Sequence, residues 1–256
     1  MGATLRTRPS LPQSEASADR RQLVAKRGGV LEHFFYFLMS LLIVTVVLYG
    51  FGRTVRTGLI HPPSPRPIIL YFHAVIFSGW VLLFIVQSTL VRMRNVKLHR
   101  RLGWFGLVLG IVIPIVGIAT AIAMGRLHVQ EGRSDAAQFL IVPFFDMVAF
   151  SVPFGFSIHW RKKPELHRRL ILIATCSLTA AAFGRFPGSL MPHHWFYAGV
   201  DFLILLGVAR DLVVTRHVHP AYVYALPLLA LGQMTTIHVF ATGWPAWIRI
   251  AHALLN

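Results

Sequence analysis

The chain has 256 residues, 55% of them hydrophobic and 13% charged, and its mean hydropathy is +0.61. A soluble domain carries about 25% charged residues, so this composition excludes a soluble globular protein and predicts an all-α integral membrane protein. The net charge of +16 does not indicate nucleic-acid binding, because Lys and Arg gather in short clusters between apolar runs. The single cysteine, Cys176, excludes an internal disulfide and a CxxC metal or redox motif.

The first 30 residues differ in composition from the rest of the chain. They contain Arg, Lys, Ser and Pro but no apolar stretch. A secretory signal would place an apolar segment much earlier in the chain than this sequence does. We therefore expect residues 1–30 to form a disordered basic tail on the cytoplasmic side.

Residues 31–241 are expected to form a polytopic transmembrane helical bundle. A helix needs roughly 20 residues to cross a bilayer, and seven apolar segments reach or approach this length. The fifth and sixth are the weakest, because each is short or contains charged residues. The seven segments lie at about 31–51, 67–91, 102–124, 137–159, 168–186, 197–215 and 220–241.

The distribution of basic residues predicts the orientation. With the N-terminus inside, 18 of the 25 Lys and Arg residues fall in the tail and the inner loops. This bias is typical of a bacterial inner-membrane protein with its N-terminus in the cytoplasm, and seven spans place the C-terminus outside. Residues 242–256 are too short to span, and their Trp, Ile and Leu pattern predicts an amphipathic segment at the outer interface.

The sequence LHRRL occurs twice, at residues 98–102 and 166–170. Its histidines, His99 and His167, precede the third and fifth apolar runs by equal offsets. Both helices run outward, so we expect the two histidines at equal depth near the inner face. Imidazoles on two facing helices can ligate one metal centre, and haem iron accepts histidine as an axial ligand.

The arginines of the same motif extend this interpretation. They can neutralise the two propionates of a haem through charge-assisted hydrogen bonds. An alternative is that LHRR anchors a helix start to anionic lipid headgroups, with no cofactor involved. The residues concerned are Arg100, Arg101, Arg168 and Arg169.

A second pair of histidines lies deeper, toward the outer face. His73 is inside the second apolar segment, and His238 is at a similar depth in the seventh. Matched depth is what a second pair of haem ligands requires. The alternative for either residue is an interhelical hydrogen bond, which is common inside membranes.

Asp146, Asp201 and Arg185 are further polar residues within apolar segments. A charge at such depth costs at least a few kcal/mol, so each must be neutral, paired or facing water. Asp201 and Arg185 fall in the outer third of neighbouring segments, and we expect an ion pair between them.

The stretch FHAVIFSGWVLLFIVQSTLVRMRNVKLHRRLGWFGLVLGIVIPIVGI contains a histidine, an apolar helix, a basic turn, a second histidine and another apolar helix. This layout resembles the transmembrane di-haem cytochrome b superfamily of ferric-reductase type. The stretch PELHRRLILIATCSLTAAAFGRFP also resembles uncharacterised multi-pass bacterial membrane proteins with HRRLGW and PE-x-HRRL-type motifs. Together the resemblances cover roughly residues 67–190.

The cytochrome b resemblance implies b-type haem, with His73, His99 and His167 at ligand positions. One departure concerns the fourth helix, where the family supplies the partner of His73. That segment has no histidine in its apolar body and carries Asp146 instead. A second haem then requires His238 or His194 as the replacement ligand.

The sequence therefore predicts a membrane b-type haem protein that transfers electrons within or across the membrane, with a quinone as an expected partner. The competing hypothesis is a non-catalytic accessory subunit of a larger respiratory or photosynthetic complex. A proton-coupled or metal transporter that uses Asp146 and the histidines is a third interpretation. A group-transfer or hydrolytic enzyme is not indicated, because the chain has no HExxH, GxSxG or P-loop motif.

Overall fold

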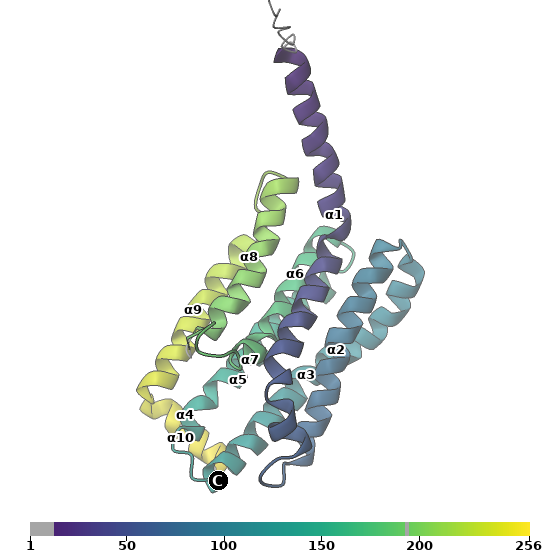
Figure 1. Ribbon diagram of the computed structural model, residues 1–256. Coiled ribbons are helices and arrows are strands. Elements are labelled where there is room, and N and C mark those ends of the chain that lie inside the picture. The colour runs from purple at the N-terminus through teal and green to yellow at the C-terminus, as the bar shows by residue number, and fades with distance from the viewer. Residues whose placement is uncertain (1–12, 193–194) are drawn as a thin grey trace, which may run out of the picture.

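Every regular element is a helix in the part of the chain that the computed structural model describes, residues 13–192 and 195–256. This confirms the predicted all-helical architecture. In chain order (Figure 1) the elements are α1 (Gln13–Gly52), the π-helix η1 (Arg56–Ile60), α2 (Ile68–Arg92), α3 (Val96–Gln130), α4 (Ala136–Phe139), α5 (Ile141–His159), α6 (Pro164–Ser177), α7 (Ala180–Phe183), α8 (Phe196–Val214), α9 (Pro220–Thr242) and α10 (Pro245–Leu255).

Within the described residues, 6 helical segments are long and apolar enough to cross a membrane. A polytopic membrane bundle is therefore confirmed by length and composition. The expected sixth span coincides with α8, which has 19 residues but carries Asp201, Arg210 and Asp211. The six segments are His33–Gly52, Ile68–Arg92, Val96–Gln130, Ala136–His159, Pro164–Phe183 and Pro220–Thr242.

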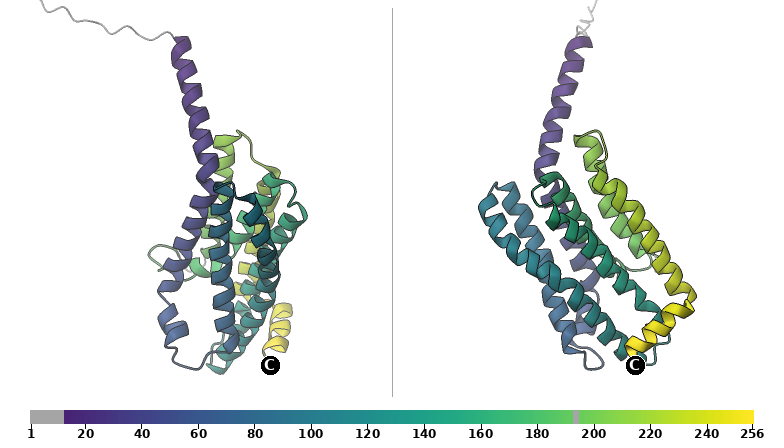
Figure 2. Two further views of the ribbon diagram at one scale, coloured as in Figure 1. Left: turned by 90° about the vertical axis from the view of Figure 1, so that its right-hand side faces the viewer. Right: turned by 180° about the vertical axis from the view of Figure 1, so that it is seen from behind.

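The first helix begins earlier than the sequence predicted. α1 starts at Gln13 and is 40 residues long, so it overlaps the segment expected to be disordered. Its N-terminal half projects beyond the rest of the bundle (Figures 1 and 2). Residues 13–27 contain neither Pro nor Gly and several Ala, Arg and Gln residues, which are good helix formers.

The α6 helix forms the centre of the bundle. Leu172, Ile173, Ala174 and Cys176 on this helix have no exposed surface. The α2–α3 pair lies on one side of α6, and the α8–α9 pair lies on the other (Figures 1 and 2). After its first turns, α6 is apolar and almost entirely buried, which is typical of a helix in the core of a membrane bundle.

The expected fifth span, 168–186, is divided into α6 and the short α7. At the break, the Ser177 hydroxyl donates to the Ile173 carbonyl at 3.1 Å, and the Thr179 hydroxyl donates to the Cys176 carbonyl at 2.6 Å. Such back-bonding bends helices because it competes with the main-chain ladder. The span is thus interrupted in its C-terminal part, a feature that the apolar pattern alone did not predict.

The C-terminal residues form an amphipathic helix, α10, at the end of the bundle opposite to the LHRRL motifs, within the segment 242–256 expected to be interfacial. The α9 helix ends at Gly243, whose positive φ of 61° is the left-handed conformation that glycine adopts without strain. Ala251 and Leu255 then pack against Leu140, and the Trp247 indole donates to the Ala137 carbonyl at 3.1 Å.

Candidate functional site

The two LHRRL motifs place their histidines at the same register of two helices. Asn95 caps α3 by accepting a hydrogen bond from the Leu98 amide at 3.2 Å, and Pro164 occupies the first position of α6. His99 and His167 are therefore each the fourth residue of their helix. Their ring centroids lie 6.4 Å apart, with an interplanar angle of 78°. The structure brings these two predicted residues together.

A backbone contact orients the ring of His167. Its Nδ1 lies 3.0 Å from the carbonyl oxygen of Ser157, a buried residue near the end of α5. When Nδ1–H donates to a carbonyl, the lone pair is left on Nε2, which is the arrangement of a metal-ligating histidine. His99 differs, because its Nδ1 is buried with no hydrogen-bond partner among the described residues.

The spacing of the two rings suits a shared metal centre. Two imidazoles that bind one metal from opposite sides, at nitrogen–metal distances of about 2.0–2.1 Å, have ring centroids about 6 Å apart. The observed 6.4 Å is close to this value. Among the described residues, no group of three or more His, Cys, Asp or Glu side chains could hold a bare metal ion. A haem needs only two axial protein ligands, so this pair has the number of donors that it requires.

The four arginines of the motifs differ in their surroundings. Arg100 and Arg101 are exposed at the start of α3. Arg168 pairs with Glu165 at 2.6 Å and lies over the ring of Tyr36 at 5.4 Å. Arg169 is 1% exposed, and its guanidinium nitrogens donate to Asp211 and Glu165.

The sequence pattern did not predict the main partner of Arg169. The guanidinium donates to both carboxylate oxygens of Asp211 on α8, at 2.8 and 2.7 Å, and to Glu165 at 2.6 Å. Arg210 also donates to Asp211, at 2.9 Å. Asp211 has no exposed surface, so this is a buried ionic cluster between α6 and α8. The signal was present in the sequence, since Arg169 lies near the start of one expected span and Asp211 near the end of the next, so that both fall at the same end of the bundle.

The structure does not bring the outer pair of histidines together. His73 is partly buried on α2 and stacks on Phe77, with ring centroids 3.9 Å apart. His238 is exposed on α9, on the opposite side of the bundle from α2 (Figures 1 and 2). His194, the other candidate partner for His73, lies outside the described residues.

The polar residues of the outer half have partners other than those expected. Asp146 accepts a hydrogen bond from the Tyr197 hydroxyl at 2.9 Å, and Asp201 accepts one from the Gln233 amide at 2.9 Å. Arg185 donates to the Ala181 carbonyl and lies over the ring of Phe51 at 4.3 Å. The expected Arg185–Asp201 ion pair is therefore not formed, because each residue is bonded elsewhere.

No protein-family model matches this chain, and no curated protein or solved structure matches it significantly.

Proposed function

We propose that the protein is a membrane b-type haem protein in which His99 and His167 are the two axial ligands of one haem. The observation that carries this proposal is the 6.4 Å separation of the two imidazole rings at matched register on α3 and α6. The Ser157 carbonyl supports it, because its position 3.0 Å from Nδ1 of His167 favours a lone pair on Nε2.

The side chains around the pair have separate roles in this proposal. The bound haem supplies reversible one-electron exchange at its iron. His99 and His167 hold the group between two helices of a rigid bundle. Arg100, Arg101 and Arg168 lie at the ends of the same helices, where they offset the negative charge of propionates. Arg169 acts indirectly, by fixing α6 against α8 through Asp211.

We propose a single haem. His73 is the third position implied by the cytochrome b resemblance, but α5 offers Asp146 where a histidine partner is needed, and His238 lies across the bundle. A lone imidazole on α2 is a poor site for a six-coordinate haem. The number of haems per chain is therefore part of the test.

The proposed setting is the bacterial inner membrane, with the N-terminus in the cytoplasm and seven spans that include α8. This rests on the occurrence of 18 of the 25 basic residues in the N-terminal tail and in the loops that the sequence assigns to the cytoplasmic side. The haem pair then lies near the cytoplasmic face. Electron exchange within the membrane, with a quinone as the expected redox partner, is the activity that this location supports.

The experiment is a dithionite-reduced minus oxidised absorbance spectrum of detergent-purified protein produced with ample haem, with pyridine haemochrome quantitation. We expect the sharp bands of a low-spin b-type haem at one haem per chain. His99→Ala and His167→Ala should each abolish these bands. His159→Ala is the matched control, because His159 is exposed at the same end of the bundle and should leave the spectrum unchanged.

A flat spectrum from folded wild-type protein would overturn the proposal, as would bands that survive both ligand substitutions. Co-purification with a larger complex and without haem would instead support the accessory-subunit alternative. Two haems per chain, one of them lost in His73→Ala, would contradict the single-haem part of the proposal.

A further inference from the structure

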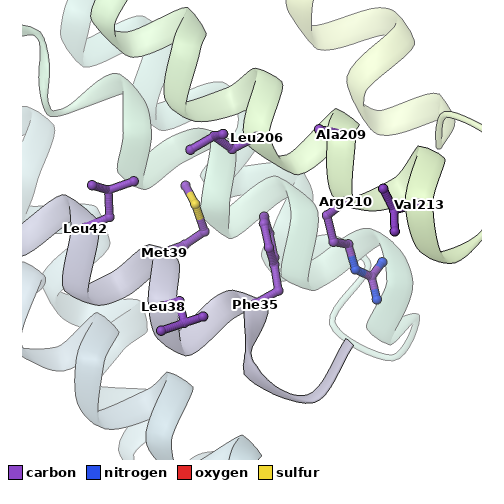
Figure 3. A pocket seen from close by; sticks show the side chains of 8 residues that line it. All are labelled: Phe35, Leu38, Met39, Leu42, Leu206, Ala209, Arg210 and Val213. Carbon is purple, nitrogen blue, oxygen red and sulfur yellow. The ribbon is translucent and has the colours of Figure 1, made fainter. Parts of the chain in front are cut away.

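The groove between α1 and α8 does not select a ligand by its chemistry (Figure 3). Its lining side chains are apolar except for Arg210, which is 2% exposed and donates to the buried carboxylate of Asp211. Buried polar atoms without a hydrogen-bond partner among the described residues are a more specific guide, because each of them needs a partner. Two such atoms, Nδ1 of His99 and Oε1 of Gln87, belong to residues that contact each other at the proposed haem site.

Gln87 on α2 reaches across the α2–α3 turn to His99. Its side-chain Nε2 donates to the main-chain carbonyl oxygen of His99 at 3.3 Å. This hydrogen bond uses one end of the amide. The other end, Oε1, is buried and has no donor among the described residues, and the imidazole Nδ1 of His99 is in the same state. Gln87 therefore offers an unused acceptor to the residue whose ring nitrogen is unused.

Ligation of iron through Nε2 would make Nδ1 of His99 a hydrogen-bond donor. Metal-ligating histidines almost always donate this N–H to a carboxylate, a carbonyl or a water molecule. His167 has such an acceptor, the Ser157 carbonyl oxygen at 3.0 Å. The side-chain oxygen of Asn95, which caps the helix of His99, already accepts the cap hydrogen bond at 3.2 Å. Oε1 of Gln87 is free to accept and is the complementary group for His99.

We propose that Gln87 is the positioning residue of His99, an inference that rests on the proposed haem ligation. Nε2 of Gln87 holds the main chain of His99, and Oε1 accepts from the imidazole Nδ1–H through one bound water molecule. A single water can satisfy a donor and an acceptor that do not bond each other directly. The two contacts fix the orientation and tautomer of the ring, so the lone pair stays on Nε2, as the Ser157 carbonyl ensures for His167.

This acceptor also affects the haem potential. An acceptor that draws the Nδ1 proton makes the imidazole a stronger electron donor to iron, which favours the ferric state. Loss of the acceptor in Gln87→Leu therefore raises the midpoint potential, whereas the carboxylate of Gln87→Glu lowers it. Both substitutions remove the Nε2 hydrogen bond to the His99 carbonyl. A role confined to holding the main chain would therefore shift the potential in the same direction in both variants.

The first measurement is the midpoint potential of the haem in wild type, Gln87→Leu and Gln87→Glu. We expect a higher potential in Gln87→Leu and a lower one in Gln87→Glu. Ser88→Glu is the matched control for charge, because its side chain leaves α2 about 100° away from that of Gln87. It should lower the potential much less than Gln87→Glu does. Shifts of the same sign in the two Gln87 variants, or equal shifts in Ser88→Glu and Gln87→Glu, would overturn the proposal.

The second measurement does not require haem. Nitrogen-15 NMR of the histidine rings in the full chain, purified without haem, reports the protonated ring nitrogen of His99, with His99→Ala for assignment. We expect a hydrogen-bonded Nδ1–H in wild type that is lost in Gln87→Leu, while His167 is unchanged. An unchanged His99 signal in Gln87→Leu would overturn the role of Gln87. A flat haem spectrum from folded wild-type protein would instead overturn the haem proposal, and the NMR result would still decide the contact.

Discussion

Arg169 and Asp211 join α6 to α8 through two parallel hydrogen bonds of 2.8 and 2.7 Å between buried side chains. The two residues are 42 positions apart in sequence, and the contact fixes the rotation of α6 directly after His167. A bidentate Arg–carboxylate pair holds its geometry more firmly than a single hydrogen bond does. The same contact thus stabilises the bundle and orients the helix that carries one proposed haem ligand.

We predict that Asp211→Asn lowers the free energy of unfolding by about 3–5 kcal/mol, because it removes the buried carboxylate that Arg169 and Arg210 share and leaves the exposed Glu165 as the remaining anion beside Arg169. Denaturant unfolding in detergent, followed by tryptophan fluorescence, measures this loss. The control is Asp135→Asn, which breaks an exposed pair with Arg133 and should cost about 0–1 kcal/mol. Equal small losses in the two variants would contradict a structural role for the buried pair.

The sequence predicted the helical bundle and the juxtaposition of His99 with His167, because both follow from patterns along the chain. Apolar segments long enough to span a membrane define the helices. The LHRRL motif occurs at the start of two of these helices, so it places the two histidines at the same position along each helix. The partner of Arg169 was not predicted, since it depends on how α6 and α8 are rotated against each other. Asp211 was interpreted only as a charge that weakened the sixth span.

Helix rotation also explains the other differences from expectation. α9 is apolar on all sides, so its sequence did not indicate that His238 faces outward while Gln233 faces Asp201. The depth of a residue in the membrane can be estimated by counting positions along its helix. The direction in which its side chain points depends on how the helices pack. Arg185 and Asp201 were paired by depth alone, and the structure gives each of them a different partner.

The protonation state of the buried Asp146 carboxyl can be tested directly. Among the described residues its carboxyl accepts from Tyr197 and has no ion-pair partner, and an ionised carboxylate in such surroundings costs several kcal/mol. We therefore expect a neutral carboxylic acid, with an infrared C=O band that disappears in Asp146→Asn. That variant should lose no more than about 1 kcal/mol of unfolding free energy, since the amide oxygen still accepts from Tyr197.

Tyr197→Phe is the companion variant for Asp146. It removes the hydroxyl donor, so we expect a loss of about 1–3 kcal/mol and a shift of the carboxyl band. If the carboxylate stretching bands of an ionised acid, and not a C=O band, were lost in Asp146→Asn, the predicted neutral state would be wrong.

The approach of α1 to α7 depends on Gly50. A Cβ at this position would clash with the backbone carbonyl oxygen of Ala182, and a backbone atom cannot move away as a flexible side chain can. We predict that Gly50→Ala separates the two helices and costs about 1–3 kcal/mol of unfolding free energy. Gly155→Ala is the control, because nothing lies within 4 Å of the added carbon, and it should carry no penalty. Equal stabilities of the two variants would contradict this close packing.

The loop before α2 is held to the end of α3 by Glu131. Its carboxylate accepts hydrogen bonds from Ser64 at 2.7 Å and from Arg66 at 2.9 Å. The Ser64 hydrogen bond, followed by Arg66, holds the pKa of Glu131 below its ordinary value of 4.5. Because the pKa of Glu131 is lower in the folded state, the ionised carboxylate stabilises the attachment of the loop above pH 4.5. This stabilisation is lost as the pH falls through the folded-state pKa.

We therefore predict that the backbone amides of His61, Ser64 and Arg66, the non-proline residues of segment 61–67, gain hydrogen exchange as the pH falls below about 4.5, after correction for the intrinsic pH dependence of exchange. Glu131→Gln should raise exchange in this loop already at neutral pH and remove its acid dependence, because the amide cannot ionise. The α2 helix that follows is the internal reference, since its main-chain bonds do not involve Glu131. Acid-dependent exchange of equal size in Glu131→Gln and wild type would show that another group controls the loop.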